Sequence, residues 1–169
     1  LLIRLTVHEK TLEQLEMSLN KVKDVAARGG SILFVGTKSQ AKSYVRQAAE
    51  ACGMPFVTER WLGGTLTNFK QVRGRVDHMV KLRDQRDKGE LEKYTKMERI
   101  LIGREIEDLT KKIGGLEPMK KLPELVFIAD IRMDKTALME AQACGIKTMA
   151  VCDTNVNPGR VDHVIPMND

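Results

Sequence analysis

One stretch of the chain, from Arg60 to Arg75, gathers residue types that bind phosphate and sugar groups. It contains four basic side chains, a double glycine, two threonines and an asparagine, but no acidic residue. Guanidinium groups bind phosphate through two donors at once, and hydroxyl and amide groups bond to phosphate and sugar oxygens. Glycines let a ligand come close to the backbone. This combination suits contacts to a nucleic acid better than chemistry on a small molecule.

The distribution of charge points to the same part of the chain. The protein has 169 residues and a formal net charge of +5. Residues 37–75 hold seven basic and two acidic side chains, whereas the other segments are balanced. A local basic excess is the electrostatic footprint of a protein that binds a polyanion. A solvated basic face without a ligand is the alternative at this point.

Short apolar runs that alternate with helical patterns predict the scaffold that positions this stretch. Leu1–Leu5 reads as the end of a strand, and Thr11 as the N-cap of a helix whose Leu12, Leu15 and Leu19 face the core. The remaining predicted strands are 31–35, 55–57, 125–130, 146–152 and 161–166, with helices after the strands at 31–35 and 125–130. Strands that alternate with helices predict an α/β fold with a doubly wound parallel sheet.

A different pattern begins at Phe69. Apolar residues recur at heptad spacing in two runs, which are separated by a turn at Lys88-Gly89 and the residues up to Thr95. The first run is Phe69, Val72, Val76 and Met79, and the second is Ile102, Ile106, Leu109 and Ile113. The intervening residues are too polar for a core helix. We therefore expect an antiparallel coiled-coil helical hairpin that projects from the sheet, in preference to a disordered charged linker.

The ends of the predicted strands are also where an α/β enzyme would bind its ligand. Gly36-Thr37-Lys38-Ser39 follows a strand, but it lacks the Gly-Lys pair of a nucleotide-binding phosphate loop. Asp130 and Asp153 are candidates for a metal or acid/base pair, although an aspartate at a strand end is commonly a turn former. Cys52, Cys144 and Cys152 lack metal-site spacing. We expect no cofactor, no metal and no enzymatic activity, and no apolar run is long enough to span a membrane.

Several motifs together resemble one family, the universal small-subunit ribosomal protein S two, in its bacterial or organellar form. They occur in the family's order and with matching spacing from Leu1 to Asp169. The matching stretches are Phe34-Val35-Gly36-Thr37-Lys38, the segment from Arg60 to Asn68, Gly114-Gly115-Leu116, Leu122-Pro123-Glu124, Asp153-Thr154-Asn155 and Ile165-Pro166-Met167-Asn168-Asp169. Phe69 stands where the family usually has Trp, and Met167 where it usually has Gly.

The resemblance implies a flavodoxin-like α/β domain, residues 1–66 and 114–169, with a coiled-coil hairpin inserted at 67–113. It implies a non-enzymatic constituent of the small ribosomal subunit, located in the ribosome of a bacterium, chloroplast or mitochondrion. Its partners would be small-subunit rRNA and neighbouring proteins of the subunit, including the large mRNA-binding one. The residues expected to contact RNA are Lys38, Arg60, Gly63, Gly64, Thr65, Thr67, Asn68, Lys70, Arg73 and Arg75.

Two other functions remain open on the residues alone. One is a nucleotide-dependent enzyme built on the parallel sheet, with Asp130 and Asp153 at its strand ends. The other is an interaction scaffold whose charged hairpin captures a protein partner, which is compatible with RNA binding by the body. The only tryptophan, Trp61, is equally suited to a core position and to contact with the nucleic acid.

Overall fold

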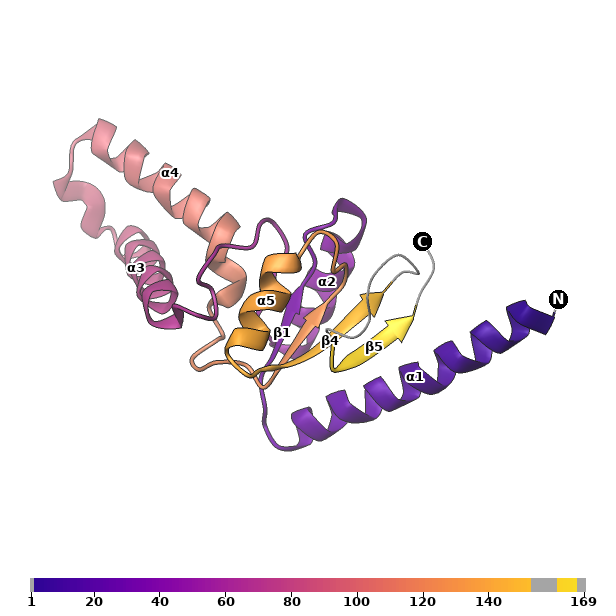
Figure 1. Ribbon diagram of the computed structural model, residues 1–169. Helices are drawn as coiled ribbons and strands as arrows, with labels where there is room; N and C mark the ends of the chain where they lie inside the picture. The colour runs from indigo at the N-terminus through magenta and orange to yellow at the C-terminus, as the bar shows by residue number, and fades with distance from the viewer. Residues whose placement is uncertain (1, 153–160, 167–169) are drawn as a thin grey trace.

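The computed structural model describes residues 2–152 and 161–166, and side chains from residue 12 onward within these ranges. Figure 1 shows a sheet with helices around it and two helices that extend to one side. In chain order the elements are α1 (Leu2–Ala27), β1 (Ile32–Val35), α2 (Ser39–Cys52), β2 (Phe56–Val57), α3 (Phe69–Asp87), the 3-10 turn η1 (Glu90–Lys93), α4 (Lys96–Ile113), the 3-10 turn η2 (Gly114–Leu116), β3 (Leu125–Ile128), α5 (Lys135–Ala143), β4 (Lys147–Cys152) and β5 (His163–Pro166).

All five strands are parallel and lie in the order β2-β1-β3-β4-β5. This confirms the predicted parallel sheet, and the order is compatible with a flavodoxin-like fold. The continuously apolar runs become strands because a parallel sheet is covered on both faces. The chain leaves β1 toward β2 on one side and continues from β3 toward β5 on the other. The carboxyl ends of β1 and β3 therefore meet where the winding reverses.

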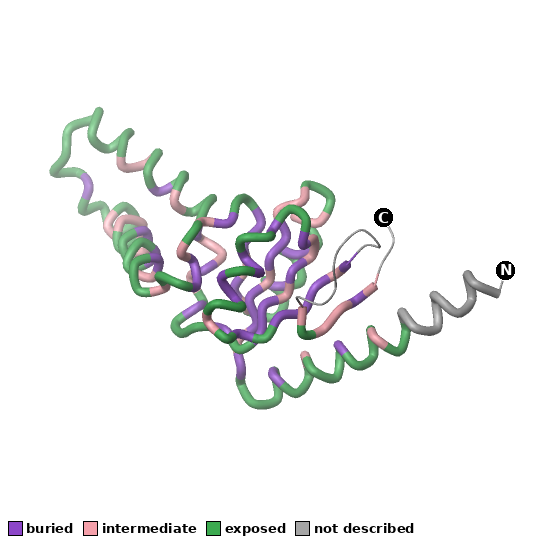
Figure 2. The backbone as a smooth tube through the Cα atoms, in the orientation of Figure 1, coloured by how far each residue is buried: buried purple, intermediate pink, exposed green. Residues whose placement is uncertain are grey.

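Alternate strand residues build two separate cores. Val35, Ile128 and Ala150 belong to the larger core, which also takes in α5, the root of the hairpin and η2. Ile32 and Leu125 belong to a smaller core on the opposite face, together with residues near the end of α1. Figure 2 shows the buried backbone concentrated in the strands, with exposed residues over most of the hairpin.

The prediction for the first thirty residues is partly wrong. Residues Leu1–Leu5 were expected in a strand and Thr11 at a helix N-cap, but one helix runs through Leu2–Ala27. No Gly or Pro interrupts that segment, so nothing in the sequence stops the helix earlier. Leu12 and Leu19 are exposed, at 59% and 48%, because α1 packs on the sheet through Ser18 and Val25. The leucines that recur at helical spacing therefore lie beside the face of α1 that packs on the sheet, and not on that face.

The two predicted helices after Asn68 are present as α3 and α4, and the chain folds back between them (Figure 1). Val72, Val76 and Met79 are buried on α3, and Ile106 and Ile113 on α4, as the heptad spacing predicts. Gly89 takes the left-handed conformation, with φ of +74°, at the start of the turn. Thr95 then caps α4 in a reciprocal arrangement with Glu98, which fixes where the returning helix begins.

Candidate nucleic-acid interface

The loop between β2 and α3 is held by one carboxylate from the far side of the sequence. Glu140 of α5 accepts hydrogen bonds at Oε1 from Trp61 Nε1 (3.0 Å) and Gly64 N (2.8 Å). Its Oε2 accepts from Leu66 N (3.0 Å), and from the amide and the hydroxyl of Thr67 (3.3 and 3.4 Å). Gly64 allows this inward curl because it adopts a φ of +88°.

Glu140 is only 8% exposed, so its carboxylate depends on these donors. Burial by itself would raise the pKa of Glu140, but the hydrogen bonds from Leu66, Trp61, Gly64 and Thr67 outweigh it and lower the pKa. The group is therefore a stable anion at neutral pH. Trp61 is also 8% exposed and packs in the larger core, which decides its role in favour of the core position.

A second carboxylate bonds to the loop at the carboxyl ends of β1 and β3. Asp134, just before α5, accepts at Oδ1 from the Thr37 hydroxyl (2.9 Å) and at Oδ2 from Thr37 N (3.2 Å). Burial raises the pKa of Asp134, and the Thr37 bonds oppose that rise. Flavodoxin-like folds bind ligands at this position, but here both donors of Thr37 already have an internal acceptor. The arrangement disfavours a nucleotide site there.

Asp130 acts at the same edge as a turn former and ion-pair partner. Its Oδ1 accepts from the backbone N–H groups of Arg132 and Met133, and its Oδ2 lies 3.5 Å from Lys38 Nζ. Asp153, the other half of the proposed acid pair, lies outside the described residues. Whether the two aspartates pair is therefore not tested by the described residues, whereas Lys38 is engaged by an acid.

Internal ion pairs account for several cations of the basic segment. Lys42 pairs with Glu59 and Arg46 with Glu50, at 3.0 and 2.8 Å. Arg73 bonds to Asp77 and also donates from Nη1 to the carbonyl oxygens of Glu117 and Met119, at 3.0 and 3.2 Å. Arg73 thus ties α3 to the chain that follows η2.

Three cations of the segment remain exposed and make no ion pair within the part of the chain that the structure describes. They are Arg60, Lys70 and Arg75. Arg60 immediately precedes the loop, and the other two lie in the first two turns of α3. Guanidinium and ammonium groups with unsatisfied donors are the natural contacts for phosphate. The basic excess in the sequence is therefore reduced, in the fold, to a small cationic surface beside a fixed loop.

The remaining predicted contact residues divide into exposed and enclosed positions. Gly63 is exposed, and a side-chain atom added there would meet nothing within 4 Å. Asn68 is exposed and donates from its amide to Gln71 Oε1 (2.6 Å). Thr65 is 1% exposed, and its hydroxyl donates to Leu62 O (2.6 Å). Thr65 is therefore part of the loop's internal support and cannot reach a ligand in this conformation.

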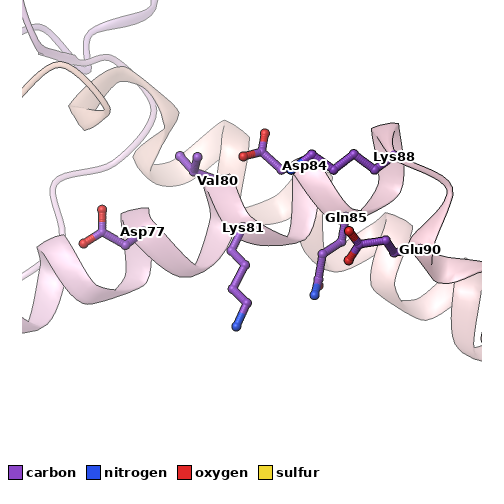
Figure 3. Close-up of a pocket in the computed structure, with 7 residues that line it drawn as sticks. All are labelled: Asp77, Val80, Lys81, Asp84, Gln85, Lys88 and Glu90. Atoms are coloured by element: carbon purple, nitrogen blue, oxygen red, sulfur yellow. The ribbon is translucent and has the colours of Figure 1, made fainter.

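The hairpin has a different electrostatic character from the loop. A cavity of about 340 Å³ runs along α3, and Figure 3 shows the side chains that line it. Its charged lining residues are Asp77, Lys81, Asp84, Lys88 and Glu90. Because acids and bases alternate there, the cavity offers no concentrated positive charge to a polyanion. The cationic surface of Arg60, Lys70 and Arg75 lies before the loop and in the first two turns of α3, not along the rest of the hairpin.

Comparison with known proteins identifies the family. The ribosomal protein S2 family matches residues 2–169. Small ribosomal subunit protein uS2 of Francisella tularensis subsp. novicida is 45% identical over 161 residues, which cover 95% of this chain and 67% of that protein. The protein of the same name from Dehalococcoides mccartyi is 40% identical over 161 residues, covering 95% of this chain and 66% of the relative.

The chain belongs to the ribosomal protein S2 family. It spans about two thirds of the length of the Dehalococcoides mccartyi relatives that it matches, 66%. This assignment confirms the resemblance that the sequence motifs indicated. Among the described residues of this S2 family member, no helix is long and apolar enough to cross a membrane.

Sequence reasoning missed Glu140 and Asp134, the two residues that shape the interface. Their partners lie 73–79 and 97 positions away, so no local motif connects them. The residues around Glu140 carried one clue to its internal role. It lies one turn from Ala137 and next to Ala141, both fully buried, on the inner side of a short helix. An acidic residue at such a position requires internal donors.

Proposed function

We propose that this chain is a non-enzymatic, RNA-binding constituent of the small ribosomal subunit, with the contacts centred on Arg60, Lys70 and Arg75. It would act in the ribosome and support subunit assembly and translation. The family assignment supports the setting, because the relatives carry the name of a small-subunit protein. Lys38, Gly63, Gly64, Thr67, Asn68 and Arg73 belong to the same proposed surface, the last as an arginine already bonded within the fold.

One observation carries this proposal: three exposed cations without internal ion pairs lie in the segments just before and just after a loop that is fixed from within. A fixed loop loses little conformational entropy when a ligand binds, so its flanking charges are already in place. Because Asp134 already accepts from both donors of Thr37, the alternative of a nucleotide-dependent enzyme is the weaker hypothesis.

The test is the salt dependence of binding to bacterial small subunits that have been washed free of their own copy of this protein. Each phosphate contact contributes roughly 0.9 to the slope of log K against log salt on duplex nucleic acid. Replacing Arg60, Lys70 and Arg75 together by Ala should therefore reduce the slope by about 2.7 and weaken binding at low salt.

A matched control removes the same charge elsewhere. Lys21 and Lys23 of α1 and Arg28 between α1 and β1 are exposed. They precede the amino end of β1, whereas the loop follows the carboxyl end of the parallel strand β2. The control triple Ala variant should bind with nearly the wild-type slope. Equal slopes for both triple variants would refute the assignment of the cationic surface.

We further propose that the hairpin is a coiled coil that contacts neighbouring proteins of the subunit, the large mRNA-binding protein among them. The alternating charges along α3 support a protein partner more than a polyanion. Deleting Arg83 to Arg99 and joining the two helices by a short turn should abolish capture of such a protein on the subunit. Retention of the chain on subunits should persist, and its loss would contradict the division of roles.

A further inference from the structure

The loop from Trp61 to Thr67 surrounds an anion that belongs to the protein itself. Four N–H groups and one hydroxyl converge on the carboxylate of Glu140, from Trp61, Gly64, Leu66 and Thr67. Converging backbone N–H groups of this kind form anion-binding concavities in other proteins. Here the concavity is filled by a side chain of α5, which is part of the main core.

The loop has few other bonds that define its path. Within it, Thr65 N donates to Leu62 O at 3.1 Å, and Asn68 N donates to Gly64 O at 2.9 Å where α3 begins. Both bonds are local and neither attaches the loop to the sheet. Glu140 is therefore the polar group that fixes the loop against the body, and through Asn68 it also fixes the start of α3.

We propose that Glu140 is a positioning residue for RNA binding, whose carboxylate holds the loop so that Arg60 and Lys70 face the ligand together. Arg60 directly precedes the loop and Lys70 follows it, so a change in the loop's path moves the two cations relative to each other. The inference rests on the proposed function.

The phosphate contacts then come from side chains and not from the backbone N–H groups of the loop. A phosphate group would need the same N–H groups of Gly64 and Thr67 that Glu140 already occupies. The backbone of the loop therefore does not bind phosphate, apart from the exposed surface at Gly63. Glu140 keeps the loop amides satisfied and leaves recognition to the flanking cations.

The experiment separates the carboxylate's charge from its bulk. Glu140→Gln keeps the size but turns an acceptor oxygen into an NH₂ group that faces N–H donors. We expect it to bind washed small subunits about tenfold more weakly or worse. The emission of Trp61, the only tryptophan, should shift because its Nε1 donor loses a charged acceptor. Far-ultraviolet circular dichroism should stay as in the wild type. Glu107→Gln, at an exposed position of α4, is the matched control and should change nothing.

A rescue measurement uses Glu140→Ala, which removes the atoms of an acetate ion. Added acetate should restore binding and the Trp61 emission in part, whereas chloride at equal ionic strength should not. Wild-type affinity in Glu140→Gln, loss of its circular dichroism signal, or equal effects of acetate and chloride would overturn the inference. If the wild-type chain itself fails to bind the subunits, it is the proposed function that fails.

Discussion

Two glycines, one in α4 and one in η2 just after the hairpin, should respond in opposite directions to the same substitution. A Cβ added at Gly115, in η2, would lie 2.3 Å from the carbonyl oxygen of Phe56 in β2 and 2.8 Å from two ring carbons of Phe56. Real Cβ atoms do not approach a backbone oxygen so closely, so η2 or β2 must move. A Cβ added at Gly103, inside α4, would meet nothing within 4 Å outside its own helix.

The expected magnitudes follow from these surroundings. Overpacking against fixed backbone costs about 1–3 kcal/mol, so Gly115→Ala should lower the free energy of unfolding by that amount. Gly103→Ala should raise it by about 0.5–1 kcal/mol, because alanine loses less backbone entropy in a helix. Neither glycine has a positive φ, so backbone strain does not enter either value.

Urea unfolding followed by circular dichroism measures both variants on one scale. For a chain of this length, each kcal/mol should also move the Tm by roughly 2–4 °C. The Gly115→Ala variant should unfold at lower urea than wild type, and Gly103→Ala at higher urea. A Gly115→Ala protein as stable as wild type would show that η2 does not pack against β2 as described, and a destabilised Gly103→Ala would refute the helical reasoning.

Three further predictions concern the polar contacts. Because the folded-state pKa of Glu140 is lowered, its carboxylate stabilises the fold above the usual glutamate pKa, and this contribution is lost as pH falls through the lowered value. The stability difference between wild type and Glu140→Gln should therefore shrink on acidification, as urea titrations at pH 7 down to pH ~3 would measure. Arg73→Met should cost about 1–3 kcal/mol, since the carbonyls of Glu117 and Met119 lose a charged donor, and faster amide exchange in η2 should report it. Thr37→Val should cost about 1–3 kcal/mol by taking a donor from buried Asp134, whereas Ser39→Ala, at an exposed hydroxyl, should be close to neutral in the same denaturation assay.

The local patterns of the chain predicted most of the architecture. Continuous apolar runs marked β1, β3 and β4 to within two residues, since strands buried on both faces need no polar positions. Heptad spacing predicted α3, α4 and the turn between them, because helix contacts repeat every three or four residues. Where a pattern was ambiguous the prediction failed, as for the helix that runs through Leu2–Ala27.

The face of α1 shows why periodicity alone is insufficient. Leu12, Leu15 and Leu19 recur at helical spacing, yet they are exposed while Ser18 is buried. Which side of a helix meets the sheet depends on where the helix lies over the strands. α1 lies against the edge strand β5, and among its described side chains it is Val22 and Val25, near its end, that join the core. That placement depends on the whole fold and cannot be predicted from the periodicity of a single helix.

For the candidate interface, contiguous residues were enough to predict the charge, the loop and the family. The motifs from Arg60 to Asn68 and the basic excess around them are contiguous features, and they pointed to a polyanion before any fold was known. They could not tell which basic groups stay available. Arg60 and Arg73 look alike in the sequence, but the fold leaves Arg60 exposed and bonds Arg73 to Asp77 and two carbonyls.

What holds the loop becomes visible in the folded chain alone. Glu140 meets Trp61 and Gly64 although β1 separates β2 from β3 in the sheet and more than seventy residues separate these partners along the chain. The partnership depends on sheet order and on burial, since a carboxylate that is 8% exposed must find donors wherever the fold brings them. Composition and spacing describe neighbours in sequence, whereas hydrogen bonding in a core selects neighbours in space.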